Sequence, residues 1–282
     1  MIVIVVTGAT GNVGGPTIEI LRSRGLKVRG VSRHPEHPDD VAADLADLDA
    51  VKAALAGATA VFSIVPAEPN QLDMEKNVIE AAKVAGPQVV ARLSSLGANP
   101  EGEDSVSRVH GQAEKLLEES GLPYTHVRGN YFMQMFLTQV DTVVNQGLFA
   151  TCCVGSAQVG FVDTRDIAEV AAKVLTSTDY VGKTLKLTGP ELLTFAECVA
   201  KLGTAVGKDL KFYDMNSDDY RNILIGAGVS EYLAGHIIGL YQRVGAGGSA
   251  VITDEVAMVT GTPARSFGTF AADYADRFKL KN

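Results

Sequence analysis

Residues 1–16, MIVIVVTGATGNVGGP, decide the fold of this chain. The run Ile2–Val6 is β-branched throughout and predicts a strand that is buried on both faces. A glycine-rich turn with Gly8, Gly11 and Gly14 follows, and the apolar spacing of a helix comes next. Strand, glycine-rich turn and helix in this order predict a site for a dinucleotide.

Each glycine of the turn has its own task. Gly8 permits the tight turn, Gly11 lets the backbone approach a pyrophosphate, and Gly14 lets the helix pack against the strand. Free N–H groups and the dipole at the start of the helix favour a phosphate group. We therefore expect the turn to bind the diphosphate of a nicotinamide cofactor. The cofactor contacts expected here are Gly8, Thr10, Gly11, Asn12, Val13 and Gly14.

The predicted strand over residues 26–32 ends next to Arg33. In NAD-binding folds an acidic residue in this neighbourhood accepts hydrogen bonds from the ribose, whereas a guanidinium pairs with a 2′-phosphate. The sequence therefore predicts a preference for NADP(H), with Arg33 on the 2′-phosphate and Ser32 or His34 assisting. A carboxylate of Glu36 or Asp39 could still serve the ribose, which leaves NAD(H) as an alternative.

The composition of the 282-residue chain is that of an ordinary globular protein, with 46% hydrophobic and 21% charged residues. A formal net charge of −8 without a basic run argues against nucleic acid as the main partner. No apolar run reaches the roughly 18 residues of a membrane span, and a strand starting at residue 2 leaves no room for a signal peptide. Cys152, Cys153 and Cys198 have no metal-ligand spacing, and the adjacent pair is too close for ordinary disulfide geometry. Reduced thiols and a cytoplasmic location are expected.

Strands and helices alternate through the first half of the chain. The predicted strands are 2–6, 26–32, 41–45, 60–65, 88–95 and 124–128, and the helices between them include 47–56 with Asp47 as N-cap, 70–85 and 105–120. This alternation predicts an α/β fold with a Rossmann-type, doubly wound parallel sheet. Ligands lie beyond the carboxyl ends of such strands, so Ser63, Ile64, Val65 and Ser94 are expected beside the cofactor.

The regular alternation of predicted strands and helices ends after Phe132. The pattern predicts helices over 133–145, 163–175, 194–206 (N-cap Thr194), 218–225 and 230–241, a last helix from Pro263, an extended segment 158–162, and strands 183–187 and 210–213. We expect a cofactor domain over 1–132 with returning segments at about 155–190, and a smaller region within 133–282. The loop Gly245–Ser249 has no strand before it, so a second phosphate-binding turn is not expected. The stripe Phe267, Phe270, Tyr274 and Phe278 predicts core packing.

Ordinary short-chain reductases carry a catalytic Tyr-x-x-x-Lys pair on the helix after the strand that ends here in Ser94 and Ser95. The segment 109–115 reads VHGQAEK, so His110 stands at the tyrosine position and Glu114 at the lysine position. The chain resembles the NmrA-like atypical short-chain dehydrogenase/reductase family. The resemblance rests on TGATGNVGG (7–15), Arg33 in VSRHPE, HGQAEKLLEESGLPYTHVRGNYFM (110–133), FVDTRDIAEVAAKVL (161–175) and KTLKLTGPELLTFAECVAKLG (183–203).

That family includes NADPH-dependent quinone oxidoreductases, triphenylmethane dye reductases and redox-sensing regulators that bind NADP without turnover. The resemblance implies a Rossmann domain with a small C-terminal α/β substrate-capping region. It also implies that Asp44 lies near the adenine. The residues it implies for the acceptor pocket are Asn130, Tyr131, Phe132 and Met133.

The absence of the Tyr-x-x-x-Lys pair indicates which kinds of substrate the protein could reduce. A general acid contributes about 10²–10⁴-fold, which a simple ketone needs because its alkoxide product is strongly basic. A quinone, an azo group or a conjugated dye cation delocalises or neutralises the incoming charge. The sequence therefore predicts an NADPH-dependent oxidoreductase for a small conjugated acceptor. His110, with an ordinary pKa of about 6.5, is either a late proton donor or only a hydrogen-bonding partner of a loop. The alternative function is a non-catalytic NADP(H) sensor that acts through a protein partner.

Overall fold

The computed structural model describes residues 3–279 and divides into two compact units. Unit 1 comprises residues 3–129, 164–186 and 258–261, and unit 2 comprises 130–163, 187–257 and 262–279. Ile2, the first residue of the predicted opening strand, lies outside the described residues. Neither unit is therefore one continuous stretch of chain.

A seven-stranded sheet with the order β3-β2-β1-β4-β5-β6-β8 runs through unit 1. Its strands are β1 (Val3–Thr7), β2 (Lys27–Ser32), β3 (Val41–Ala42), β4 (Ala60–Ser63), β5 (Val89–Ser95), β6 (Tyr124–Gly129) and β8 (Lys183–Leu187). Neighbouring strands from β3 to β6 pair in parallel. The chain builds outward from β1 to β3 and then returns to place β4 on the other side of β1. The order therefore reverses at β1, the place where open sheets of this kind bind ligands.

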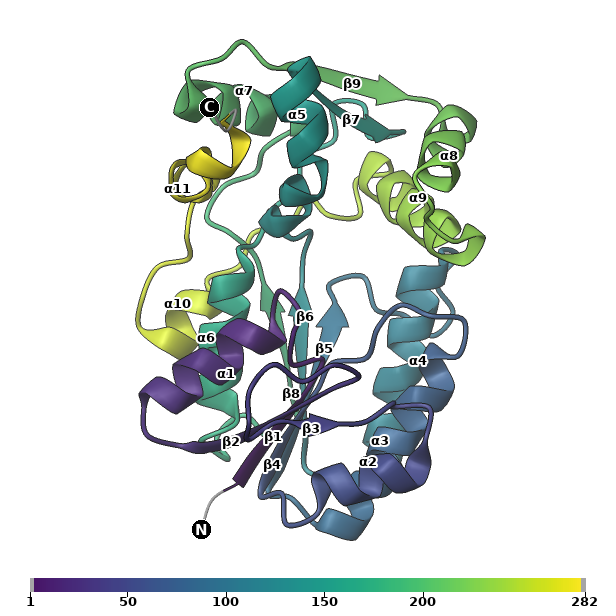
Figure 1. Cartoon of the computed structure of the whole chain (residues 1–282), viewed down its shortest axis with the longest axis vertical. Coiled ribbons are helices and arrows are strands. Elements are labelled where there is room, and N and C mark those ends of the chain that lie inside the picture. The colour runs from purple at the N-terminus through teal and green to yellow at the C-terminus, as the bar shows by residue number, and fades with distance from the viewer. Residues whose placement is uncertain (1–2, 280–282) are drawn as a thin grey trace. The chain divides into compact units, whose positions relative to one another are not determined.

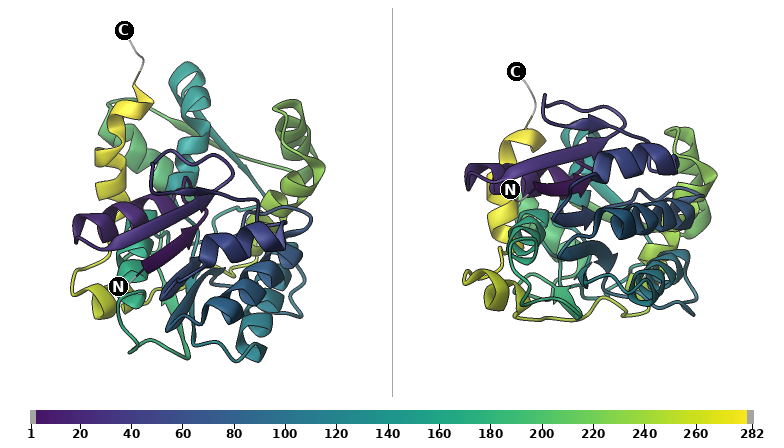
Figure 2. Two further views of the ribbon diagram at one scale, coloured as in Figure 1. Left: turned by 60° about the horizontal axis from the view of Figure 1, so that its bottom comes forward. Right: turned by 90° about the horizontal axis from the view of Figure 1, so that it is seen from below.

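Helices cover both faces of this sheet. They are α1 (Gly14–Ser23), α2 (Leu48–Leu55), α3 (Gln71–Ala85), α4 (Ser105–Glu119) and α6 (Thr164–Val174). Helices α1 and α6 lie together on one face, and α2, α3 and α4 lie on the other (Figure 1). Figure 2 shows α2, α3 and α4, in blue, side by side. The predicted Rossmann-type α/β fold is confirmed.

The β-branched strands supply the core of unit 1, as their sequence predicts. Val5, Val61 and Val90, on three neighbouring strands, are at most 1% exposed and pack with Leu55 of α2 and Val78 of α3. Asp47 is the N-cap of α2, because its side chain accepts hydrogen bonds from two backbone N–H groups of the first turn. The sheet and the helices pack into layers because the facing strand and helix residues are apolar, and Asp47 fixes the start of α2.

One predicted strand of unit 1 is too long. Residues 41–45 were expected to be extended, but β3 covers only Val41–Ala42. The chain turns directly afterwards, because Asp44 accepts a hydrogen bond from the Ala46 N–H at 2.9 Å and its carbonyl accepts one from the Asp47 N–H. The short strand brings the chain into α2 within a few residues.

Unit 2 is built around a cluster of aromatic side chains. Its elements are the 3-10 helix η1 (Met133–Gln139), α5 (Val140–Gln146), β7 (Leu148–Cys152), α7 (Phe195–Val206), β9 (Lys211–Met215), α8 (Ser217–Gly226), α9 (Glu231–Gly245), α11 (Phe267–Asp273) and the 3-10 helix η2 (Ala275–Phe278). Helix α10 (Glu255–Thr260) has residues in both units. Phe136 stacks on Phe149 with ring centroids 4.5 Å apart and meets Phe267 edge to face. Phe270 and Phe278 are also buried, so the predicted core stripe is confirmed for the phenylalanines.

The structure corrects two helices predicted in unit 2. The single helix over 133–145 is wrong, since η1 ends at Gln139, whose side-chain amide exchanges two hydrogen bonds with the backbone of Ala150. The last helix begins at Phe267 and not at Pro263, because Ser266 caps it by accepting from the Thr269 N–H. Strand β7, which pairs in parallel with β9, was not predicted, and neither was α10.

Three properties of the described residues concern the function classes considered above. Within residues 3–279, no helix has the length and apolar character needed to cross a bilayer. Over the same residues, no group of three or more His, Cys, Asp and Glu side chains is arranged to hold a metal ion. Cys152, Cys153 and Cys198 are free thiols.

Candidate functional site

The turn after β1 requires its glycines for steric reasons. Gly8 has φ +62°, a left-handed conformation that a side chain would strain, and a Cβ there would lie 2.9 Å from Cγ2 of Ile64. A Cβ on Gly14 would lie 2.2 Å from the carbonyl oxygen of Gly8, so α1 approaches the turn more closely than any other residue allows. The Gly11 N–H closes the turn by donating to the same oxygen at 3.0 Å. The result is bare backbone at the carboxyl end of β1.

At the start of α1, the Gly14 N–H group can bind a ligand. The next amides are already used or missing, because Gly15 and Thr17 donate to the Gly11 and Val13 carbonyls and Pro16 has no N–H. The N-cap residue, Val13, offers no side-chain acceptor to the first turn. The first N–H group of a helix has no partner within the helix, so that of Gly14 needs solvent or a bound anion. Thr10 and Asn12 are exposed beside it.

The strands on both sides of β1 end in buried hydroxyl groups. Within the described residues, the Oγ atoms of Ser32 (β2) and Ser63 (β4) are buried and have no hydrogen-bond partner. Thr7 fixes the backbone beyond β4, since its hydroxyl donates to the Ile64 carbonyl at 2.9 Å and accepts from the Ile64 N–H at 2.7 Å. Buried polar groups require partners, and the hydroxyls and phosphates of a dinucleotide would supply them. The residues at this edge of the sheet therefore fit NAD(P)(H).

Arg33 follows β2 and is the residue predicted to bind the 2′-phosphate of NADP(H). Its side chain is 60% exposed and forms an ion pair with Glu68, 35% exposed, at 3.2 Å. Exposed ion pairs of this kind contribute about 0–1 kcal/mol, so a phosphate can replace Glu68 at low cost. Asp44, expected near the adenine, is exposed and uses one oxygen in its own turn.

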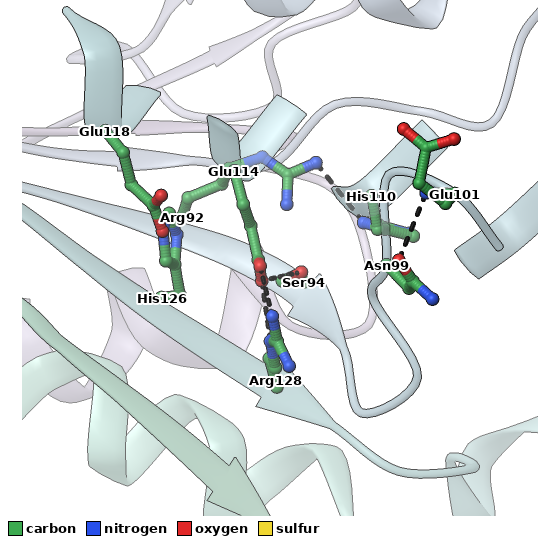
Figure 3. Close-up of polar contacts among 9 residues, drawn as sticks. All are labelled: Arg92, Ser94, Asn99, Glu101, His110, Glu114, Glu118, His126 and Arg128. Carbon is green, nitrogen blue, oxygen red and sulfur yellow. Dashed lines mark hydrogen bonds and ion pairs between the residues drawn. The ribbon is translucent and has the colours of Figure 1, made fainter. Parts of the chain in front are cut away.

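A three-residue polar cluster joins the ends of β5 and β6 to α4 (Figure 3). Ser94 Oγ donates to Glu114 Oε1 at 2.6 Å, and Arg128 donates from Nε to Oε1 at 2.8 Å and from a terminal nitrogen to Oε2 at 2.5 Å. Burial raises the pKa of Glu114, but the hydrogen bonds from Arg128 and Ser94 outweigh it, so the pKa lies below its usual value. Glu114 is therefore an anion at neutral pH, and the proton of Ser94 is directed to it.

A second chain of contacts leads from α3 to His110. Arg92, in the middle of β5, is only 1% exposed. One terminal nitrogen, Nη2, donates to Glu75 Oε1 at 2.7 Å. The same nitrogen lies 3.2 Å from Nδ1 of His110 (Figure 3). His110 itself is half-buried on α4. The imidazole at the former tyrosine position is therefore in contact with a buried cation.

His126 is a further titratable group of this region. It lies opposite Arg92 in the register of β5 and β6, is fully buried, and meets Glu118 at 3.2 Å. Burial lowers the pKa of His126; Glu114 and Glu118 oppose this shift, and the charge of Arg92 adds to it. His126 is therefore neutral at neutral pH.

Comparison with known proteins gives the family. A family model described as NAD(P)H-binding matches residues 8–178. The chain belongs to this NAD(P)H-binding family. It is 30% identical over 283 residues to the NAD(P)H azoreductase of Xenophilus azovorans, with 98% of this chain and 99% of the relative covered.

Two further proteins are similar to this chain over almost its full length. The (4-alkanoyl-5-oxo-2,5-dihydrofuran-3-yl)methyl phosphate reductase of Streptomyces griseus is 33% identical over 283 residues, covering 98% of this chain and 99% of the relative. The crystal structure of the NADPH-dependent quinone oxidoreductase QOR2 of Escherichia coli, complexed with NADPH, has a TM-score of 0.85 at 24% identity, covering 96% of this chain and 99% of that chain. The NmrA-like resemblance that the sequence indicates is confirmed at the level of the NAD(P)H-binding family and of the fold, which NmrA shares.

The residues expected for the acceptor pocket of this NAD(P)H-binding protein lie in unit 2. Asn130 is buried and donates to the Ser249 carbonyl, while its own Oδ1 accepts from the Tyr131 N–H. Tyr131 is also buried, its hydroxyl donates to that of Tyr241 at 2.9 Å, and burial raises its pKa well above the usual value. Met133 is 1% exposed, whereas Phe132 is half-buried. Asn130 and Tyr131 thus use their polar groups within unit 2.

The residues of the site that were not predicted include Thr7, Glu68, Arg92 and Arg128. A signal for Arg92 was present in the sequence, because an arginine inside the apolar strand VVARLSS has to find a buried partner. Glu68 lies in a loop, where no periodicity indicates which way a side chain points.

Proposed function

We propose that this protein is an NADPH-dependent oxidoreductase that reduces a small conjugated acceptor, such as a quinone or an azo compound. The arrangement around Glu114 carries the proposal. Where ordinary short-chain reductases have a lysine that assists proton donation, this chain has a carboxylate anion, and that anion accepts the hydrogen bond of the Ser94 hydroxyl at 2.6 Å. A site arranged in this way favours acceptors whose reduction does not need a strong acid.

The cofactor would be held by unit 1. Gly8, Gly11 and Gly14 give the diphosphate access to the backbone of the turn and to the Gly14 N–H at the start of α1, and Arg33 binds the 2′-phosphate. The buried hydroxyls of Ser32 and Ser63 provide hydrogen bonds at the same edge of the sheet, together with contacts from Ile64, Val65 and Ser94. When bound, NADPH supplies the hydride. The protein's own contribution is position and the exclusion of water.

Unit 2 is proposed to carry the residues that contact the acceptor, with Asn130, Tyr131, Phe132 and Met133 as the first candidates. Their roles differ: the half-buried Phe132 offers a ring for stacking on a conjugated acceptor, and the buried Asn130 and Tyr131 hold the backbone around it. We assign to His110 the role of interacting with the negative charge that develops on the acceptor during its reduction. The three free thiols suit a reducing compartment, and we place the enzyme in the cytoplasm.

The experiment is a turnover assay with matched acceptors. Purified protein is given NADPH and, in turn, a benzoquinone, an azo dye, a triphenylmethane dye and a simple ketone as the control. We expect oxidation of NADPH with at least one conjugated acceptor and none with the ketone.

The opposite result has a defined meaning. If the protein binds NADPH tightly but no acceptor is reduced, the enzyme proposal is wrong. A non-catalytic NADP(H) sensor acting on a protein partner would then fit the same residues. Calorimetry with NADP⁺ and NADPH tests it, since a sensor must distinguish the two forms.

A further inference from the structure

The loop that carries Arg33 lies at the edge of the sheet of unit 1. Residues 33–39 are exposed without interruption, so no buried side chain among them orders the loop. At its far end, β3 pairs with β2 through two residues, Val41 and Ala42. An exposed loop that is closed by so short a strand needs a further attachment before Arg33 can have a defined position.

Asp40 provides this attachment from the position directly before β3. Its side chain is 8% exposed, and the oxygen Oδ1 accepts a hydrogen bond from the N–H of Gly30, in β2, at 2.7 Å. The same oxygen accepts a hydrogen bond at 2.5 Å from Nη2 of Arg22, in the last turn of α1. One carboxylate therefore joins the end of the loop to a strand and to a helix.

The absence of a side chain at Gly30 leaves room for two neighbours. A Cβ on Gly30 would lie 2.7 Å from Oδ1 of Asp40 and 2.8 Å from Cβ of Ala9, in the glycine-rich turn. The N–H of Ala9 donates to the carbonyl of Val31, in β2, at 3.2 Å. A glycine within a strand often marks such a close approach. The turn that follows β1 and the loop that follows β2 therefore meet at Gly30.

The negative charge of Asp40 is compensated within unit 1. A lone carboxylate close to a phosphate site would repel the ligand, but Arg22 forms an ion pair with Asp40 and is itself only 25% exposed. Partly buried pairs are screened less by salt than surface pairs are. Asp40 can therefore anchor the loop with little repulsion of a negatively charged cofactor.

We propose that Asp40 is a positioning residue that fixes the loop of residues 33–39 and thereby sets the preference for NADP(H) through Arg33. This rests on the proposed function, in which Arg33 binds the 2′-phosphate. A loop and a long side chain that have to be ordered at the moment of binding reduce the affinity, and an anchored loop avoids that loss. NADH has no 2′-phosphate, so its binding does not depend on the position of Arg33.

The test is a calorimetric titration with NADPH and with NADH, which does not require turnover. Asp40→Ala removes both hydrogen bonds, so it should weaken NADPH binding by about three- to tenfold and change NADH binding by less than about twofold. Asp40→Asn keeps an oxygen for the N–H of Gly30 but loses the ion pair, and its affinity for NADPH should lie between those of the wild type and Asp40→Ala.

The sign of the change is informative. Removing a carboxylate close to a phosphate site would, by its charge alone, strengthen NADPH binding. Stronger or unchanged NADPH binding in Asp40→Ala would therefore overturn the proposal. Glu80→Ala, which removes an exposed carboxylate paired with Lys83 on α3, is the matched control and should leave both affinities unchanged.

A double-mutant cycle shows whether Asp40 acts through Arg33. In an Arg33→Ala background, Asp40→Ala should change NADPH binding by less than about twofold, because the side chain that Asp40 positions is missing. The same loss of affinity with and without Arg33 would overturn the proposal. If Asp40→Ala does not fold, Asp40→Asn takes its place in the cycle, and the same direction of change is expected.

The single variants separate this proposal from the proposed function. If Arg33→Ala weakens NADPH binding more than NADH binding but Asp40→Ala does not, Arg33 keeps its role and the positioning by Asp40 is wrong. If Arg33→Ala weakens the binding of both cofactors equally, the assignment of the 2′-phosphate to Arg33 is wrong and the role of Asp40 is overturned with it. The reduction of a conjugated acceptor is measured by turnover and does not depend on either result.

Discussion

At the scale of single residues, Arg33 determines how the protein distinguishes its two cofactors. Its exposed ion pair with Glu68 is too weak to hold the guanidinium away from a ligand. Arg33→Glu should therefore weaken NADPH binding by about ten- to a hundredfold, the equivalent of one charge-assisted contact of about 1.5–3 kcal/mol, and spare NADH. Calorimetric titration with both cofactors measures the difference.

Glu68→Gln is the matched control for that change. It removes the ion pair but keeps Arg33, so NADPH binding should be unchanged or slightly stronger. Equal losses of NADPH and NADH in Arg33→Glu would contradict the assignment of the 2′-phosphate to this residue.

Gly14 and Gly15 offer a second residue-scale comparison, because only one of them is sterically required. A Cβ on Gly14 would lie 2.2 Å from the Gly8 carbonyl oxygen, whereas a Cβ on Gly15 would meet the nearest oxygen, that of Ala9, at 3.4 Å. Gly14→Ala should lower the free energy of unfolding by about 1–3 kcal/mol and weaken NADPH binding at least tenfold. Gly15→Ala should fold normally, since alanine favours the helix over glycine by up to about 1 kcal/mol. Thermal unfolding with and without NADPH measures both effects, and equal behaviour of the two variants would count against the packing described here.

The sequence predicted these residues unequally well, for a physical reason. Gly8, Gly11 and Gly14 could be predicted because their spacing expresses a local backbone requirement that is complete within one turn. The contact of Arg92 with His110 joins positions 18 residues apart on different elements. Such a contact depends on how α4 packs on β5, which no local pattern contains.

At the scale of elements, the Arg92–Glu75 pair links β5 to α3 through the core. Arg92→Met alone should destabilise the protein by about 3–5 kcal/mol, because the Glu75 carboxylate is left buried without its cation. The double variant Arg92→Met with Glu75→Met should recover most of this loss. Urea unfolding of the three proteins provides the free energies. A double variant as unstable as the single one would show that the pair itself, and not the orphaned charge, is the source of the stability.

Two predicted helix starts agree with the structure because one capping side chain sets each of them, whereas the cap of α11, Ser266, was not recognised. Asp47 and Thr194 cap α2 and α7 at the predicted places, since each accepts a hydrogen bond from the first turn of its helix. The break at Gln139 could not be predicted, because it depends on the backbone of Ala150 and so on the position of β7. The predicted helix start is therefore accurate at Asp47 and Thr194 and wrong at Ser266.

At the scale of the whole molecule, His126 should make the stability depend on pH. Its pKa in the folded protein lies below that of an unfolded histidine, about 6.5, so the unfolded chain binds the proton more strongly. The free energy of unfolding should therefore fall as the pH falls below about 6.5, with a slope of up to about 1.4 kcal/mol per pH unit from this group. Glu114, whose pKa is also lowered, acts only at more acidic pH, where its carboxylate becomes protonated.

The measurement is a series of urea unfolding curves between about pH 5 and 8, in the wild type and in His126→Gln. The variant should have a flatter pH profile in this window, whatever its absolute stability. His34→Gln, at an exposed position, is the matched control for the loss of one histidine. A wild-type profile that is already flat would contradict the neutral, buried state of His126.

The discontinuity of unit 1 has a consequence for synthesis on the ribosome. Helix α6 packs on α1, and β8 occupies the sheet edge beside β6, although both lie beyond residue 163. A nascent chain that has emerged only as far as β6 therefore presents an unpaired strand edge and an uncovered apolar face on α1. The glycine-rich turn after β1 can form early in synthesis. The packing of α6 on α1 and of β8 on β6 has to wait until β8 has left the exit tunnel. During that interval the growing polypeptide is most exposed to aggregation and most dependent on chaperones.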